Sequence, residues 1–423
     1  MSLISLGEAR SLVLSVCSPL PPVTVPVDQS LGCTLAADGV ARVAVPPFPN
    51  SAMDGYALRS ADVARVPATL RVVGIVLAGS GDPGRMASGE AIRIMTGAPV
   101  PSGADAVCMV EKTRTDGDMV VIDSSVSLGE NIRVAGEDIA CGAVVVAAGT
   151  TIGATQLAAL VSAGCSEVYV VPRPRVGVIS TGDELVDPGQ SLGIGQIYDS
   201  NRPMLRAMVA EAGCVPVDLG HARDDEETIT SIVETARDQI DALVLSGGVS
   251  VGDVDLVRVV LEKLGGGTGR SLSIAIRPAK PFAFAMLGGE GAGLVGTSTN
   301  VPAFGLPGNP VSAAVSFELL VRPALLTMAG LHRVDRPVVT ARAAVPLKRR
   351  DDGKVFFLRV ALSRDVDGWV AVPVAGQGSH QIGSMARADG LAILDEGPGI
   401  AEGEQVRVMI TSPDRLAEER VRW

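Results

Sequence analysis

The chain is poor in aromatic residues and in histidine, and it lacks several familiar catalytic motifs. Phe, Trp and Tyr make up 3% of the 423 residues, so the hydrophobic cores must be built mainly from aliphatic side chains. The three histidines, His221, His332 and His380, form no metal-binding pattern, and isolated histidines are usually ordinary surface or hydrogen-bonded residues. The sequence contains no P-loop, no H-E-x-x-H and no G-x-S-x-G, which argues against the enzyme classes that those motifs mark.

Cysteine pairs and long membrane-type runs are also missing. The six cysteines are scattered without a C-x-x-C pair, so we expect free thiols in a reducing compartment rather than a zinc site or disulfides. No basic region followed by an apolar run marks the N-terminus, which predicts no signal peptide. One uncharged stretch, Ile139–Ser166, is broken by glycines and polar residues, so it predicts a strand, a turn and a helix rather than a membrane span. These features predict a cytoplasmic protein without a membrane partner.

The charge balance is acidic. The chain has 36 Lys and Arg against 47 Asp and Glu, which gives a formal net charge of −11. This balance argues against non-specific nucleic-acid binding, which needs a basic surface. A small anionic ligand is still compatible with it, provided that local basic groups, helix N-termini or a divalent cation offset the negative charge.

The pattern of apolar residues changes along the chain and predicts several domains. The pattern predicts short strands and turns for residues 43–144. It predicts short strands again for residues 330–423, which suggest a β-barrel. Residues 174–329 alternate strands with helices, as in a doubly wound α/β sheet. Expected elements there include strands Arg175–Ser180, Val215–Leu219 and Ala242–Ser246, and helices Pro203–Ala212, Asp225–Gln239 and Pro310–Ala329. We predict a linker or dimerisation domain (1–42 and 145–173), a β-rich inserted domain (43–144), an α/β domain (174–329) and a C-terminal domain (330–423).

Polar loops follow the strands of the predicted α/β domain, where ligands of such sheets collect. Adjacent glycines let backbone N–H groups approach a phosphate, and the helix that begins at Pro310 adds a partial positive charge. Glu184 and Asp255 could hold a hard cation such as Mg²⁺, and Arg277 and Lys280 could balance phosphate charge. The loops contain Thr181, Gly182, Asp183 and Glu184, then Ser246, Gly247, Gly248 and Ser250, and finally Pro307, Gly308, Asn309 and Pro310.

Each of these signals also has a structural explanation. Helix capping would explain Thr181-x-x-Glu184, Asp224-x-x-Glu227 and Asn309. A tight turn would explain Gly247–Gly248 taken alone. Their recurrence at three successive strand ends favours a site. By contrast, Gly291–Gly296 matches G-x-G-x-x-G but is not followed by a helix pattern, so a dinucleotide site is not expected there.

The predicted β-rich insertion has polar segments of its own. They bring Asp54, Thr96 and Asp138, which are suited to metal, water or anion contacts, although a structural role in turns is the default interpretation. The sequence alone does not say that they face the α/β site.

Seven segments together resemble the molybdopterin molybdenumtransferases, the MoeA family that includes the E domain of gephyrin. They span nearly the whole chain, and their length and order make the resemblance specific. The segments are PPFPNSAMDGYA (46–57), RIMTGAPVPSGADAV (93–107), GENIRVAGEDI (129–139), STGDEL (180–185), GQIYDSN (195–201), SGGVSVGDVD (246–255) and GLPGNPVSAAVSFE (305–318).

The resemblance implies four domains, an elongated homodimer, and a cleft shared between the α/β domain of one subunit and the insertion of the other. It implies a Mg²⁺-dependent reaction in which molybdate is loaded onto adenylylated molybdopterin and AMP leaves. Partners of such an enzyme would be a molybdopterin adenylyltransferase and molybdoenzymes. Carried over, Glu184, Asp224 and Asp255 resemble carboxylates that hold Mg²⁺ or contact the nucleotide, and Asp54, Thr96 and Asp138 resemble residues of the molybdate and pyrophosphate region. Gly247, Gly248, Ser250, Gly308, Asn309 and Ser312 would cradle phosphate and pterin, and Ser379 would line the cleft.

The chain departs from the family pattern at one place. Where the family usually reads K-P-G-K-P, this sequence has Arg277-Pro278-Ala279-Lys280-Pro281. Arg keeps the charge with a different geometry, and Ala279 loses the freedom of glycine at positive φ. Three alternative functions remain open: adenylylation of molybdopterin, a non-catalytic scaffold, and a paralogue that handles tungstate.

Overall fold

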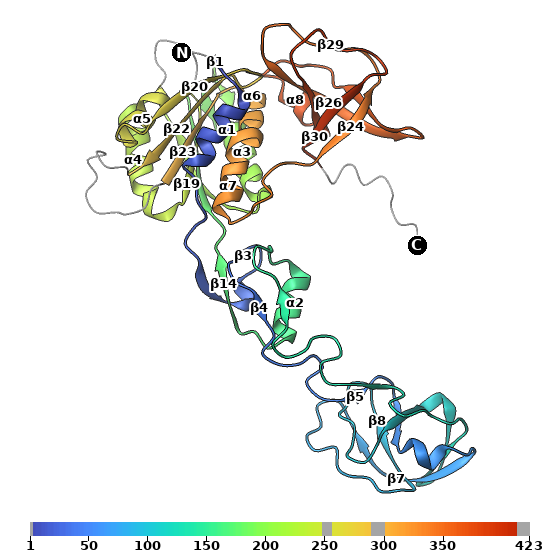
Figure 1. Cartoon of the computed structure of the whole chain (residues 1–423). Coiled ribbons are helices and arrows are strands. Elements are labelled where there is room, and N and C mark those ends of the chain that lie inside the picture. The colour runs from blue at the N-terminus through green and yellow to red at the C-terminus, as the bar shows by residue number, and fades with distance from the viewer. Residues whose placement is uncertain (1–2, 248–255, 289–300, 413–423) are drawn as a thin grey trace. The chain divides into compact units, whose positions relative to one another are not determined.

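The computed structural model describes residues 3–247, 256–288 and 301–412 (Figure 1). The chain divides into two compact units, which are called unit 1 (residues 1–22 and 171–423) and unit 2 (residues 23–170). Unit 2 is therefore inserted into unit 1 between the first helix and the first long strand of the latter. The finer division into four domains remains a prediction.

A seven-stranded mixed sheet forms the centre of unit 1. β15 pairs in parallel with β18 and β19, and β19 pairs in parallel with β23. β22 runs antiparallel to both β20 and β23, so one strand departs from the parallel pattern. The order is β1 (Leu3–Ile4), β20 (Arg270–Ile274), β22 (Pro281–Leu287), β23 (Val301–Leu306), β19 (Ala242–Ser246), β15 (Arg175–Thr181) and β18 (Val215–Ala222).

Helices cover both faces of this sheet, which confirms the doubly wound α/β prediction. Within β15, Val176 and Val178 pack into one core and Ile179 into the other, because successive strand side chains point to opposite faces. A strand buried on both faces is apolar along its buried middle, as the run VGVI at 176–179 of β15 shows. The first core contains α1 (Leu6–Ser15), α3 (Asn201–Glu211), α6 (Pro310–Ser316) and α7 (Arg322–Met328), and the second contains α4 (Glu226–Ala236) and α5 (Leu256–Leu264).

The residues at the helix starts show which candidate site residues also act as helix caps. Ser5 and Glu8 form the predicted capping box of α1. α4 is capped by Asp225, whose carboxylate accepts from the backbone N–H of Thr228 at 2.8 Å, so Asp224 is not needed as a cap. Glu184 precedes a strand rather than entering a helix, and Asn309 stands at the N-cap of α6 without making a capping bond. The capping interpretation is therefore wrong for Asp224 and Glu184.

The predicted helix Pro310–Ala329 is formed by α6, a π-helical turn at Phe317–Val321, and α7. Within the π turn, the buried carboxylate of Glu318 accepts two hydrogen bonds from Arg336, at 2.8 and 2.9 Å. Within the described ranges, Pro310–Met328 is the one helix long and apolar enough to cross a membrane. Since 89% of its most apolar window is buried inside the protein, it is better explained as a core helix.

The C-terminal part of unit 1 is a closed β-barrel, as predicted. Its strands follow the order β21-β26-β27-β24-β30-β28, and pairing of β26 with β28 closes the barrel. Its interior is aliphatic, with Val360, Leu394 and Val408 almost fully buried. The strands are β21 (Ile276–Arg277), β24 (Val338–Ala343), β26 (Val355–Asp365), β27 (Gly368–Pro373), β28 (Gly390–Leu394) and β30 (Gln405–Ile410).

Unit 2 contains a six-stranded sheet and a smaller part around α2 (Ala154–Ser162). The uncharged stretch Ile139–Ser166 forms β13 (Val144–Val146), a turn and α2, as predicted. β2 (Val23–Pro26) and β14 (Glu167–Val171) pair antiparallel where the chain enters and leaves unit 2. No disulfide joins any of the six cysteines, all of which lie in the described ranges. The sheet is formed by β10 (Thr113–Asp116), β11 (Met119–Ile122), β7 (Ala68–Val76), β8 (Glu90–Ile94), β6 (Gly55–Leu58) and β9 (Ala106–Met109).

Candidate functional site

A pocket of about 650 Å³ lies at the carboxyl ends of β15, β18, β19 and β23. Parallel strands bring their carboxyl ends to one edge of a sheet, so loops distant in sequence converge there. The structure brings eleven of the predicted site residues together in the pocket wall, although their roles remain predictions. They are Thr181, Gly182, Glu184, Asp224, Ser246, Gly247, Pro307, Gly308, Asn309, Pro310 and Ser312.

Gly247 allows two of these loops to touch. Its φ is +141°, and a Cβ atom there would lie 2.2 Å from Thr181 Oγ1 and 2.5 Å from the Thr181 carbonyl oxygen. A side chain therefore cannot be added without moving backbone. Thr181 is 4% exposed, and its hydroxyl has no hydrogen-bond partner within the described ranges. A buried hydroxyl without a partner is costly, so this group is suited to a polar ligand.

Three carboxylates line the pocket, those of Glu184, Asp199 and Asp224. The Asp199 carboxylate accepts from Ser180 and Arg202, which leaves those of Glu184 and Asp224 to hold a metal in the pocket. Asp183 does not line it, but its carboxylate accepts from the backbone N–H of Asp224 at 3.4 Å. Mg²⁺ is commonly held by one or two protein carboxylates together with substrate phosphates and water, so this donor set fits Mg²⁺. Over the described residues, no group of three or more His, Cys, Asp or Glu side chains is clustered for a metal. Asp255, the third predicted ligand, lies outside the described residues, as do Gly248 and Ser250.

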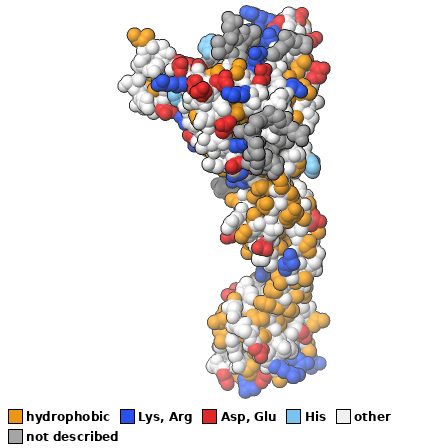
Figure 2. Space-filling model, turned by 90° about the vertical axis from the view of Figure 1, so that its left-hand side faces the viewer, with side chains coloured by type: hydrophobic (Ala, Val, Ile, Leu, Met, Phe, Trp, Pro, Cys, Tyr) orange, Lys and Arg blue, Asp and Glu red, His pale blue; other side chains and the backbone are white. Residues whose placement is uncertain are grey.

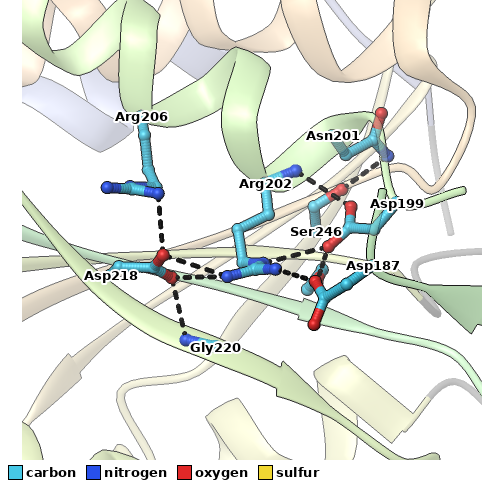
Figure 3. A network of polar contacts seen from close by, with 9 residues as sticks. Asp187, Asp199, Asn201, Arg202, Arg206, Asp218, Gly220 and Ser246 are labelled. Carbon is cyan, nitrogen blue, oxygen red and sulfur yellow. Dashed lines mark hydrogen bonds and ion pairs between the residues drawn. The ribbon is translucent and has the colours of Figure 1, made fainter. Parts of the chain in front are cut away.

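Sequence reasoning missed the contribution of residues 197–201 to the pocket. Asp199 is 2% exposed and accepts from Ser180 Oγ at 2.5 Å and from Arg202 Nε at 3.1 Å (Figure 3). Arg202 also bonds Asp187 and Asp218, and Arg206 lies 2.7 Å from Asp218. Burial acts to raise the pKa of Asp218, but hydrogen bonds from Arg202 and from a backbone N–H outweigh it and lower that pKa. This network anchors the start of α3 to β15 and β18.

Asn201 connects two of the predicted loops, and Figure 3 shows its contact with the first of them, at Ser246. Its side-chain NH₂ donates to Ser246 Oγ at 2.8 Å and to the Gly308 carbonyl at 2.7 Å. The Gly308 carbonyl can only accept, which fixes the orientation of the amide. The signal for these residues was present in the GQIYDSN segment, whose polar residues directly precede a helix, but strand-end reasoning did not reach them.

Three family models match consecutive parts of the chain. The model for the MoeA N-terminal region (domain I and II) matches residues 4–164, “Probable molybdopterin binding domain” matches 177–327, and the MoeA C-terminal region (domain IV) matches 340–411. A molybdopterin molybdenumtransferase of Haemophilus influenzae is 36% identical over 411 residues, which cover 96% of this chain and 98% of the relative. The chain belongs to the MoeA family.

Other comparisons agree with this assignment. Molybdopterin molybdenumtransferase 2 of Mycobacterium tuberculosis is 36% identical over 417 residues, covering 96% of this chain and 98% of that protein. The crystal structure of a molybdopterin biosynthesis MoeA protein from Pyrococcus horikoshii matches with a TM-score of 0.77 and 34% identity. That match covers 97% of this chain and 99% of the other, so the MoeA fold extends over essentially the whole protein.

The C-terminal barrel of this MoeA protein contributes His380 and Ile382 to the pocket. Ser379, the predicted residue, is not in the lining, but its carbonyl accepts from the backbone N–H of Val311 at 3.0 Å. Arg359 is fully buried and donates to the carbonyls of Gly376 and Gly378, at 3.0 and 3.2 Å. Burial lowers the pKa of Arg359 to about 10. The barrel thus holds the 376–380 loop against the start of α6.

The segment that departs from the MoeA pattern has a distinctive backbone. Ala279 has a φ of +77° and is 4% exposed, so alanine occupies the left-handed conformation that the family fills with glycine. Arg277 and Lys280 are not in the pocket lining, whereas Pro281 is. The Arg277 guanidinium lies 3.8 Å from Asp352 and 5.9 Å from the centre of the Phe356 ring.

In unit 2, Asp54 and Thr96 are joined directly. The Asp54 carboxylate accepts from the backbone N–H of Thr96 at 2.7 Å and from its hydroxyl at 2.8 Å. These two hydrogen bonds, the backbone one first, lower the pKa of Asp54, so its carboxylate is ionised at neutral pH. Asp138 is exposed, and across the described chain no hydrogen bond links its carboxylate to either residue. The G-x-G-x-x-G match at 291–296 lies outside the described residues.

Proposed function

We propose that this protein inserts molybdate into adenylylated molybdopterin in a Mg²⁺-dependent reaction that releases AMP. The coarser statement, that it is a transferase of molybdenum cofactor biosynthesis, rests on full-length relatives that carry the name molybdopterin molybdenumtransferase. The observation that carries the finer proposal is the pocket in which Glu184 and Asp224 meet the glycine-containing loops after β19 and β23.

The pocket residues divide into metal-binding and anion-binding groups under this proposal. Glu184 and Asp224, together with Asp255, would hold Mg²⁺, which stabilises negative charge that develops on pyrophosphate oxygens. Backbone N–H groups around Gly247 and Gly308 would contact phosphate. The Gly247 backbone lies close to Thr181, and no side chain stands between the two residues. The Thr181 hydroxyl, which lacks a protein partner in the described ranges, would donate to a substrate oxygen. Ser246, Ser250, Asn309 and Ser312 would complete the cradle.

The proposal includes a homodimer in which unit 2 of one subunit completes the cleft of the other. Asp54, Thr96 and Asp138 would then come from the partner to the molybdate and pyrophosphate region. The part of unit 2 around β2, β14 and α2 exposes many apolar side chains (Figure 2), and such surfaces commonly mark protein interfaces. Those more than a third exposed include Val23, Leu31, Val40, Val43, Val144, Val161 and Tyr169.

The open alternatives have distinct outcomes in a single assay. Consumption of ATP with free molybdopterin would mark an adenylyltransferase, although unit 2 and the barrel are unnecessary for that reaction. Binding of the pterin nucleotide without turnover would mark a scaffold. Turnover with tungstate but not molybdate would mark a tungsten-handling enzyme. We place the reaction in the cytoplasm, with free thiols as the supporting observation.

The test follows AMP release and active cofactor formation from adenylylated molybdopterin, Mg²⁺ and molybdate. Wild type should release AMP, and Asp224→Asn should lose most of the activity because one pocket carboxylate no longer carries charge. The matched control is Asp238→Asn, an exposed acid at the far end of α4, which should behave as wild type. The proposal fails if wild type releases no AMP, or if both variants are equally active.

A further inference from the structure

Tyr198 brings an aromatic residue to the wall of the pocket, and none of the roles above uses it. The residue lines the pocket and is 45% exposed, although the chain has only three tyrosines. Among the lining residues that the structure describes, it is the one Phe, Tyr or Trp. A half-exposed ring at a pocket contributes little to a core, so its position points to contact with a ligand.

The segment that carries Tyr198 is held in place on both sides. β16 (Leu185–Val186) pairs in parallel with β17 (Ile197–Tyr198), and the backbone N–H of Ile197 donates to the Glu184 carbonyl at 2.9 Å. The Tyr198 hydroxyl donates to the Gln190 carbonyl at 2.9 Å, while the next residue, Asp199, is buried in the Arg202 network. The ring is therefore positioned before a ligand binds, which reduces the cost of ordering it.

The surroundings of the ring suit a flat ligand with polar edges. Apolar side chains join Tyr198 in the lining, among them Leu185, Ile197, Pro307 and Ile382, while carboxylates and hydroxyls line the rest. Ligand pockets commonly combine such apolar surfaces with a few placed polar groups. Adenylylated molybdopterin contains two flat heterocycles, the pterin and the adenine, and either can stack on a phenol ring.

We propose that Tyr198 is a substrate-binding residue whose ring stacks against a flat heterocycle of the substrate. The inference rests on the proposed function, because that function supplies the heterocycle. Pterin and adenine share the chemistry that the ring would recognise, so separate ligands must distinguish them.

The experiment measures the dissociation constants of molybdopterin and of AMP separately, for wild type, Tyr198→Phe and Tyr198→Leu. Tyr198→Leu should weaken one ligand roughly three- to tenfold, the size expected for a stacking contact, while Tyr198→Phe stays within about twofold of wild type. Loss confined to molybdopterin assigns the pterin, and loss confined to AMP assigns the adenine. Unchanged affinity for both ligands in Tyr198→Leu overturns the proposal. Equal loss in Tyr198→Phe also overturns it, because the hydroxyl would then be the contact.

The matched control is Trp369→Leu, a partly exposed aromatic residue in β27 of the barrel and outside the pocket lining, which should alter neither affinity. Thermal melts of all variants establish that Tyr198→Leu is folded. In turnover, Tyr198→Leu should raise KM and leave kcat nearly unchanged. A wild type that binds both ligands yet releases no AMP would contradict the proposed function alone. A wild type that binds neither would overturn both.

Discussion

The pocket of unit 1 and the Asp54–Thr96 pair of unit 2 hold acidic side chains in different ways. In unit 1, Asp199 is buried, and Arg202 joins it to two further aspartates around the pocket. In unit 2, Asp54 is exposed, and its hydrogen bonds come from a single neighbour, Thr96. Removal of one member should therefore disturb several loops in unit 1 but only one contact in unit 2.

The difference reflects how each site is built. The pocket exists because parallel strands end at one edge, so its geometry belongs to the core of unit 1. Asp54 directly precedes β6 and Thr96 closely follows β8, and these two strands are neighbours in the sheet of unit 2. The pair therefore needs no deep packing. Substitutions in the pocket should therefore affect both stability and activity strongly, whereas those at the pair should affect activity with only a small change in stability.

The largest effect is expected for Gly247→Ala. The added Cβ would overlap the Thr181 carbonyl oxygen, a backbone atom that cannot turn away, so the loops after β15 and β19 must separate. A displacement of about 1 Å in a catalytic site commonly costs ~100-fold in rate, which we expect in the AMP-release assay.

The counterpart in unit 2 is Gly97→Ala, at a φ of +80° with no atom within 4 Å of the new Cβ. It should lose about 1–2 kcal/mol of stability through backbone strain and remain active. Similar activity of the two variants would show that the close contact at Gly247 is not needed.

Arg202→Met should destabilise unit 1 by roughly 3 kcal/mol, because it leaves the buried Asp199 carboxylate without its cation. Chemical denaturation, followed by the transition of unit 1, measures the change. Arg114→Met removes the exposed Arg114–Asp123 pair of unit 2 and should leave the unfolding midpoint unchanged. A midpoint for Arg202→Met equal to that of wild type would mean that Ser180 and the backbone suffice to hold Asp199.

Thr96→Val should raise the pKa of Asp54, although not fully, because the backbone N–H, the larger cause, remains. The Asp54 pKa is lowered in the folded state, so its stabilising contribution is present above the ordinary value of 3.8 and is lost as the pH falls through the folded pKa. Wild type and variant should therefore differ in stability near neutral pH and converge below that value. Carboxyl NMR titration measures the pKa directly, and Asp123, which is held by Arg114, serves as the internal reference. An unmoved Asp54 pKa would contradict the hydroxyl contribution.

The smallest effect is expected for Ala279→Gly. Glycine relieves the left-handed backbone at φ +77° but removes a buried methyl group, so stability should rise by no more than about 1 kcal/mol. Ala283→Gly, in the neighbouring strand β22 and similarly buried, should instead lower stability. At this position glycine only increases the backbone entropy that is lost on folding and leaves a small void. The melting temperatures of these two variants should shift in opposite directions. A shift in the same direction would exclude strain at Ala279.

Local patterns in the sequence were sufficient for most of the fold. Ser5–Glu8 predicted the first helix, and alternating strand and helix patterns predicted the central sheet, because capping and hydrophobic periodicity are visible among residues close in sequence. The direction of β22 was not foreseen, since an apolar strand buried on both faces looks the same in either direction.

The candidate site was predictable where it follows the rule that ligands of α/β sheets bind at the carboxyl ends of the strands. Glu184, Ser246, Gly247 and Asn309 all lie in the lining that this rule predicts. Tyr198, Asp199 and Asn201 were missed, because their approach depends on how β17 folds back along β16. His380 could not be foreseen from the α/β pattern, since the barrel supplies it through packing against α6. Contacts between elements far apart in sequence leave no local signature.

The nesting of unit 2 inside unit 1 sets an order of assembly during synthesis. The strand pairs described for unit 2 join residues of one continuous stretch, 23–170, which can fold as it leaves the ribosome. β1 must instead wait for β20, since Leu3 pairs with Ser273 and Ile4 with Ile274. Residues 3 and 4 are thus made long before their partners and are among the last to take their place in the sheet. Unit 2 should be protected from protease while unit 1 is still incomplete, and the pocket should be the last part of the enzyme to form.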